Sequence, residues 1–444
     1  MKSMNKEHQA NKSKKALANS SWLVFSKVIN MAVGFIASVL LTRYLGAEQK
    51  GILSNAQALS SVFSFVASFG LLDIVVSQFS SNREQSSIIA ASSMTLMFVC
   101  GIVAFFLSII TSFILKVDIE IVLYVSILSS NFLFQFMEVF SYWFYSNSIS
   151  KNSSICQSII HIFFIILKVA GIVLKRKLVF FVIIFSLENI LIYFSYIFCY
   201  KKSECFFEGR FKPSIEVIKK LIKYAFPMVI QGFAISIYMK IDQIMVGKII
   251  GNVELGYYSV AVNLAEYWYF IPSSIYISFL PVLSAYFFDK KEFEKKLQEF
   301  TDIVMTIGYL AIIVFGVFGK YIIYYLYGSE FLYVSNVLLI YIWTGLFTCL
   351  SFSGQAYYVV KKETKTIMYI NILEAIINLV LNMLLIKELG SIGAALATLI
   401  DYVIVCFGQM IILGKNNKRL YKIQIKSFFP FKRIHRYIIT NVRK

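Results

Sequence analysis

The sequence predicts an all-α integral membrane protein of about twelve transmembrane helices, arranged as two parallel six-helix lobes around a central cavity. Three observations predict this fold class: the composition, the recurrence of long apolar runs and the sidedness of the basic residues. Hydrophobic residues make up 58% of the 444 positions and charged residues only 15%. A soluble core cannot hide so many apolar side chains, so the predicted surroundings are lipid.

Apolar runs of about 20 residues, long enough to cross the hydrocarbon core of a bilayer, recur along nearly the whole chain. We place the spans at 20–42, 52–79, 88–115, 119–145, 154–174, 178–200, 224–247, 256–285, 301–319, 321–347, 366–386 and 391–413. One boundary has an alternative. Because Gly319 and Lys320 interrupt an apolar run, the tenth helix can instead be shifted toward Val360.

The net charge of +19 is explained by topology rather than by nucleic acid. With the amino terminus inside, 31 of the 43 Lys and Arg residues fall in cytoplasmic segments and 9 in outer loops. This asymmetry is what the positive-inside rule requires, and it predicts that both termini are cytoplasmic. The cluster 175–177 is the one violation, marking either a misplaced boundary or a functional basic patch.

The longest connection between spans, at 201–223, is basic and lies at the middle of the chain. We therefore expect a cytoplasmic tail at 1–19, a first lobe at 20–200, a linker at 201–223, a second lobe at 224–413 and a basic cytoplasmic tail at 414–444. No loop is long enough for a catalytic or nucleotide-binding domain, and there is no phosphate-binding loop that ends in Lys-Ser or Lys-Thr. The prediction is a transporter rather than an enzyme, without cofactor or metal, since the six cysteines also lack metal-ligand spacing.

The two predicted lobes share a motif in the turn between their first and second helices. Each turn has a basic residue, two residues, Gly, four residues, Gly, two residues and Ser, at 43–54 and at 248–259. The offset of 205 also carries Ala56 onto Ala261 and Leu59 onto Leu264. This match favours a duplication over chance similarity of two turns, and units of six helices must repeat in parallel.

Charged residues within spans are costly, about 2.5 to 3.5 kcal/mol each at mid-depth, so each is a candidate functional position. The set is Lys27, Asp73, Glu138, His161, Lys168, Glu188, Lys240, Asp242, Glu266, Glu374 and Asp401. Snorkelling toward the interface is an equally good interpretation for the lysines near helix ends. For the glutamates, the alternative to a functional role is a structural ion pair with these lysines.

Five short segments carry a family resemblance: 41–46 (LTRYLG), 69–71 (FGL), 241–243 (IDQ), 255–261 (LGYYSVA) and 391–398 (SIGAALAT). They resemble the Wzx-type polysaccharide flippases of the multidrug/oligosaccharidyl-lipid/polysaccharide (MOP) exporter superfamily. The chain departs from the pattern at Lys50 and Leu53, where that family usually has aromatic residues. Order and spacing carry the resemblance, because small residues at helix openings are common wherever helices pack closely.

The resemblance implies a flippase in a bacterial plasma membrane that moves an undecaprenyl-diphosphate-linked oligosaccharide by alternating access, for O-antigen or capsule biosynthesis. The implied partners are the lipid-linked oligosaccharide, membrane lipids, and polymerase and chain-length machinery. An ion-coupled multidrug or metabolite exporter of the same superfamily is the alternative. A polysaccharide polymerase is disfavoured by the short outer loops, and a lipid II flippase by the smaller number of helices and the basic tail.

A diphosphate-linked sugar needs cations for its phosphates. We assign substrate binding to Lys27, Lys168, Arg43 and Lys248, with interfacial anchoring as the alternative for the last two. We assign gating or ion coupling to Asp242, Asp73, Glu138, Glu266 and Glu374. Asp242 is preferred, because its short side chain cannot snorkel to the interface.

Overall fold

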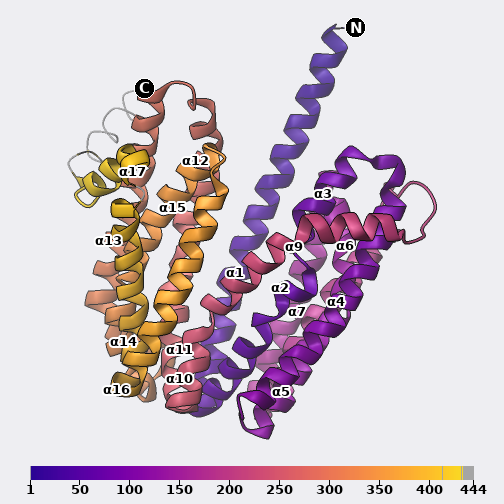
Figure 1. Ribbon diagram of the computed structural model, residues 1–444. Helices are drawn as coiled ribbons and strands as arrows, with labels where there is room; N and C mark the ends of the chain where they lie inside the picture. The colour runs from indigo at the N-terminus through magenta and orange to yellow at the C-terminus, as the bar shows by residue number, and fades with distance from the viewer. Residues whose placement is uncertain (1, 413, 432, 434–444) are drawn as a thin grey trace. The chain divides into compact units, whose positions relative to one another are not determined.

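A computed structural model shows a chain whose regular structure is helical throughout the described residues (Figure 1). The structure describes the backbone of residues 2–412, 414–431 and 433, and the side chains of residues 30–363, 365–408, 417–431 and 433. Within that part of the chain, nine helices are long and apolar enough to cross a membrane. The count rises to as many as ten if the bent pair Ile119–Leu133 and Gln135–Ser146 is one span. The predicted fold class is confirmed.

The chain divides into two compact units, which are described separately. The first is Met1–Leu45 with Asn55–Lys240, and the second is Gly46–Ser54 with Ile241–Lys444. The expected division into six and six helices at the linker stays a prediction. In the structure the linker region belongs to the first unit, because the backbone N–H groups of Glu208 and Ser214 donate to the Ser86 and Ser92 hydroxyls, at 2.7 and 2.9 Å.

The first unit contains most of the long helix α1 and the helices that follow it up to α9. The bounds are α1 (Lys2–Val62), α2 (Ser64–Ser68), α3 (Leu72–Ser81), α4 (Ser86–Ile114), α5 (Ile119–Ser129), α6 (Val139–Ser146), α7 (Lys151–Val173), α8 (Leu178–Lys201) and α9 (Ile215–Tyr238). Its core packs around Trp143, whose indole Nε1 donates to the Cys205 carbonyl at 3.0 Å. Phe79 meets this indole edge to face, with ring centroids 5.2 Å apart.

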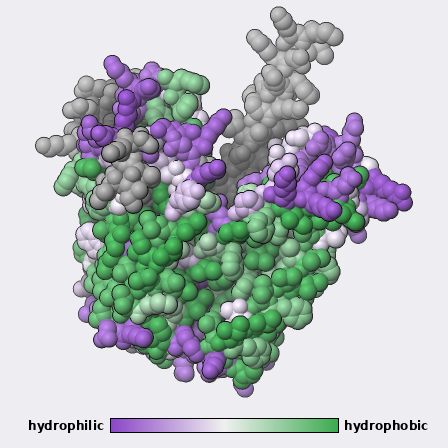
Figure 2. All heavy atoms as spheres, viewed as in Figure 1, coloured by the Kyte–Doolittle hydropathy of each residue, from purple (hydrophilic) through white to green (hydrophobic). Residues whose placement is uncertain are grey.

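The second unit is built from the helices after Lys240 and from the short segment Gly46–Ser54 of α1. The bounds are α10 (Ile241–Ile249), α11 (Asn252–Glu266), α12 (Phe270–Ala285), α13 (Lys290–Tyr327), α14 (Val334–Tyr341), α15 (Thr344–Val360), α16 (Thr364–Ile412) and α17 (Gly414–Ser427). Figure 2 shows a broad hydrophobic band on the visible side of this unit, with hydrophilic residues above and below it. The exposed apolar side chains of α13 that are expected to face lipid are Leu310, Ile313, Val314, Val317 and Phe318.

Two of the membrane-crossing segments are kinked at a glycine. Asn30–Ser81 bends at Gly46, and Lys365–Gly408 bends at Gly390. Each segment is long enough for two crossings, since 44 residues of helix extend roughly 66 Å against a hydrocarbon core of about 30 Å. The kinks fall between predicted spans one and two and between spans eleven and twelve. These two segments agree with a total of twelve spans, and that total stays a prediction.

One predicted boundary was wrong. The break assigned to Gly319 and Lys320 does not exist, because α13 continues to Tyr327. A single glycine costs a helix only about 1 kcal/mol, so packing on Leu338 can hold Gly319 in the helix. The break comes at Gly328, whose φ of 93° ends the helix. The following span runs from Val334 to Val360, which confirms the alternative placement of the tenth helix.

Candidate functional site

The two glycine turns that share a sequence motif also share a backbone conformation. Gly46 has φ 72° and ψ 176°, and Gly251, 205 positions later, has φ 121° and ψ 176°. Both lie in the left-handed region that favours glycine over other residues. The segment Gly46–Ser54 packs within the second unit, so the two copies of the motif meet there.

The contact between the two copies is reciprocal. A Cβ built on Gly51 would lie 1.6 Å from the carbonyl oxygen of Asn252, and one built on Gly256 would lie 2.0 Å from that of Ala47. The equivalent serines, Ser54 and Ser259, share a hydrogen bond of 3.0 Å between their hydroxyls. The two turns are therefore related by an approximate two-fold axis, and only glycine permits the backbones to approach so closely.

Carboxylates from elsewhere in the second unit support the helix starts that follow positive-φ glycines. Glu330 accepts a hydrogen bond of 2.8 Å from the backbone N–H of Ala47, directly after Gly46. Glu254 accepts one of 2.5 Å from the hydroxyl of Ser391, directly after Gly390. Glu330 thereby satisfies a backbone amide at a helix start, and the negative charge of either carboxylate interacts favourably with the dipole of the helix that follows.

A cluster of three titratable side chains lies between α7 and α8 in the first unit. Glu188 accepts from Lys168 at 2.6 Å with one carboxylate oxygen and contacts the His161 ring nitrogen Nδ1 at 2.5 Å with the other. The Lys168 and Glu188 side chains are only 7% and 9% exposed. Lys168 was assigned to substrate binding from the sequence. In the structure Glu188 balances the charge of Lys168, which corresponds to the structural ion pair named as the alternative.

Two of the predicted gating residues of the second unit, Asp242 and Glu266, lie among tyrosines. Asp242 is buried and accepts a hydrogen bond from the Tyr258 hydroxyl. Glu266 accepts one of 2.9 Å from the Tyr341 hydroxyl, and the Tyr258 and Tyr341 rings meet edge to face at 6.2 Å. This polar layer of acid and phenol groups inside an apolar bundle is held by α10, α11 and α14.

The other candidates are dispersed. Arg43, Lys248 and Asp73 are exposed, Glu138 is partly buried beside Gln135 at 3.4 Å, and Glu374 is buried on α16. The side chain of Lys27 lies outside the described residues. Among residues with described side chains, no group of three or more His, Cys, Asp and Glu residues could hold a metal ion.

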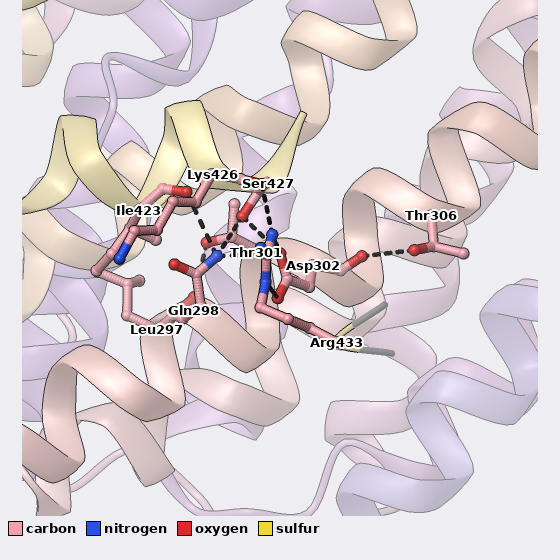
Figure 3. A network of polar contacts seen from close by, with 9 residues as sticks. All are labelled: Leu297, Gln298, Thr301, Asp302, Thr306, Ile423, Lys426, Ser427 and Arg433. Atoms are coloured by element: carbon pink, nitrogen blue, oxygen red, sulfur yellow. Dashed lines mark hydrogen bonds and ion pairs between the residues drawn. The ribbon is translucent and has the colours of Figure 1, made fainter. Parts of the chain in front are cut away.

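A buried network that the sequence analysis missed surrounds Asp302 on α13 (Figure 3). Arg433 binds the fully buried Asp302 carboxylate with two nitrogens, Nε at 2.8 Å and Nη2 at 2.9 Å. The Ser427 hydroxyl and the Gln298 amide donate to the same carboxylate at 2.7 and 3.0 Å. The tail after α17 thereby neutralises a buried charge. No local pattern links Asp302 with a residue 131 positions away.

Replacing Arg433 with Met is expected to destabilise the protein by about 3 kcal/mol, the lower end of the range for breaking a buried pair, because Arg433 is 30% exposed. The loss of stability is measured by heating the purified protein in detergent and recording the fraction that stays monodisperse. The double variant Arg433→Met with Asp302→Asn should recover most of it. Arg419→Met, in an exposed pair with Glu294, is the matched control and should cost about 1 kcal/mol or less.

The comparisons with known proteins agree on the class of protein. The family model described as polysaccharide biosynthesis protein matches residues 16–287, and the MatE model matches residues 227–384. No curated protein matches the chain by sequence.

Solved structures with a similar fold include the lipid II flippase MurJ in an inward closed conformation, at a TM-score of 0.70 and 20% identity over 91% of this chain and 90% of that one. An inward-facing multidrug resistance MATE transporter of the MOP superfamily has a TM-score of 0.67 and 13% sequence identity, over 89% of this chain and 96% of that one. A MOP superfamily transporter from Pyrococcus furiosus has a TM-score of 0.57 and 13% sequence identity, over 93% of this chain and 96% of that one. The chain is therefore a multi-pass membrane protein with the fold of the MOP superfamily, and it belongs to the polysaccharide biosynthesis protein family.

Proposed function

We propose that the protein is a flippase that moves an undecaprenyl-diphosphate-linked oligosaccharide across a bacterial plasma membrane, for O-antigen or capsule biosynthesis. The family match over residues 16–287 carries the proposal. The fold, which is shared with a lipid II flippase, is compatible with a lipid-linked substrate. Both termini are proposed to be cytoplasmic, and the mechanism is alternating access.

The cations that meet the substrate in this proposal are Arg43 and Lys248, whose exposed side chains follow the first predicted helix of each lobe. Lys168 is paired with Glu188, so it can bind the substrate only if this ion pair breaks. A dianionic head group that leaves an inside-negative cell gains about 2.3 kcal/mol per charge per 100 mV if it crosses the full potential. This drive needs no ATP.

The test uses vesicles that contain the purified protein and a fluorescent lipid-linked oligosaccharide. Label in the inner leaflet should become accessible to an external quencher in protein-containing vesicles and stay protected in protein-free vesicles. If protein-containing vesicles protect the label equally well, the flippase proposal is lost.

An ion-coupled multidrug exporter is the second candidate, favoured by the MatE match over residues 227–384. The distinguishing measurement is resistance to cationic dyes in cells that overproduce the protein. Resistance without flipping of the lipid-linked oligosaccharide would favour the exporter.

Replacing Asp242 with Ala is expected to lower the flipping rate at least tenfold, because a residue assigned to gating or ion coupling is lost from the polar layer with Tyr258. The vesicle assay gives the rate, and equal yields of monodisperse protein show that folding is retained. Glu363→Gln, an exposed carboxylate of the same unit, is the control and should flip at the wild-type rate. Wild-type flipping by the Asp242 variant would contradict the assigned role.

A further inference from the structure

The helix α17 presents two different faces. One face is buried on the second unit through Asn417, Leu420, Tyr421, Gln424 and Ser427. The opposite face carries Lys418, Lys422, Ile425 and Lys426, all exposed, and Phe429 continues it just after the helix. We call these five residues the basic tail face.

Side-chain contacts fix the direction in which the basic tail face points. Gln424 donates from Nε2 to the Leu350 carbonyl at 3.2 Å, and the Tyr357 hydroxyl donates to Asn417 at 3.3 Å. Beyond the helix, Arg433 is bound by Asp302 (Figure 3). Because α17 is held at both ends, it cannot rotate to hide its exposed apolar side chains.

The depth of the basic tail face relative to the membrane is set by α13. The Tyr309 hydroxyl donates to the Phe428 carbonyl at 2.8 Å, and its ring lies 5.5 Å from that of Phe431. Nearer its start, α13 contacts α17 itself: Arg419 pairs with Glu294 at 2.8 Å, and Gln298 donates to the Ser427 hydroxyl at 2.6 Å. Glu294 and Gln298 come just before the predicted span 301–319, so α17 and its lysines are expected at the level of lipid head groups.

Exposed apolar side chains accompany the lysines. Phe429 is 80% exposed and Ile425 is 54% exposed, although both belong to the basic tail. Lysines beside large apolar residues on one face are typical of helices that lie in the membrane interface, where the apolar groups enter the boundary and the cations meet phosphates.

We propose that the basic tail face binds the phosphate groups of anionic bilayer lipids. The lysines contact the head groups, while Ile425 and Phe429 insert at the boundary with the acyl chains. This binding holds the cytoplasmic end of the second unit against the inner leaflet. It does not depend on which substrate the protein transports.

The test is native mass spectrometry of the full-length protein in detergent, with phosphatidylglycerol and phosphatidylcholine added in separate titrations. Wild type is expected to bind phosphatidylglycerol more tightly. The variant K418Q/K422Q/K426Q should bind it at least tenfold more weakly, with phosphatidylcholine binding unchanged, because each lysine near an anionic surface contributes about fivefold. If the triple variant does not fold, K422Q alone should weaken binding about fivefold.

The matched control is K290Q/K291Q/K295Q, which removes the same charge from three exposed residues of the second unit that are interspersed with Asp289, Glu292 and Glu294. It should bind phosphatidylglycerol as wild type does. An equal loss in this control would show a general effect of net charge and overturn the proposal. Unchanged binding in the tail variants would overturn it as well.

Discussion

Replacing Gly51 with alanine is expected to destabilise the protein by roughly 3 kcal/mol or more. The new Cβ would lie 1.6 Å from the Asn252 carbonyl oxygen, far inside van der Waals contact, and backbone cannot yield as a flexible side chain can. Overpacking typically costs about 1 to 3 kcal/mol, and a clash with backbone belongs at or above the upper end. Gly256→Ala should be similar, since its Cβ would lie 2.0 Å from the Ala47 carbonyl oxygen.

The purified protein is heated in detergent, and the monodisperse fraction that remains is measured. The readout is the temperature at which half of the protein has left the monodisperse peak. Operational stability of this kind does not require reversible unfolding. Gly316→Ala is the control, because nothing lies within 4 Å of its Cβ position. Its change should be small and of either sign. If Gly51→Ala melted like Gly316→Ala, the close contact between the two turns would be refuted.

Replacing Lys168 with Met is expected to cost about 3 to 5 kcal/mol, because it leaves the Glu188 carboxylate buried with His161 as its remaining partner in the ion cluster. The same thermal assay measures the loss. The double variant Lys168→Met with Glu188→Gln should regain much of it, because a buried pair replaced by neutral groups costs far less than a broken one.

The control for this cluster is Lys295→Met. Lys295 pairs with Glu292 at 3.1 Å, but its side chain is 59% exposed, so the expected change is about 0.5 kcal/mol. Two observations would contradict the prediction for Lys168: a loss as small as in this control, or a double variant no more stable than Lys168→Met.

The candidate site could be predicted from the sequence only as a set of residues. Asp242, Glu266 and Lys168 were found because a charge within an apolar run is visible in the sequence. The tyrosine partners of the two carboxylates were not, since Tyr258 and Tyr341 are ordinary aromatic residues in such runs. Whether Lys168 meets substrate or Glu188 depends on the rotation of α7 against α8, which hydropathy does not record.

The repeat shows the same limit. The matching turns at 43–54 and 248–259 were visible as spacing, and the structure gives Gly46 and Gly251 the same extended, positive-φ conformation. That the two copies would pack on each other through Gly51 and Gly256 was not predicted. Spacing along one chain does not say which segments meet.

The sequence by itself determined the class of fold, because membrane insertion depends on the length and apolarity of local runs. The same logic misplaced the boundary at Gly319, where tertiary packing holds a weak helix former in α13. Only the tertiary structure decided which distant groups meet, above all Asp302 with Arg433 and Gly51 with Asn252. Such contacts arise from the packing of helices against one another, and that packing is a property of the folded chain rather than of any one segment.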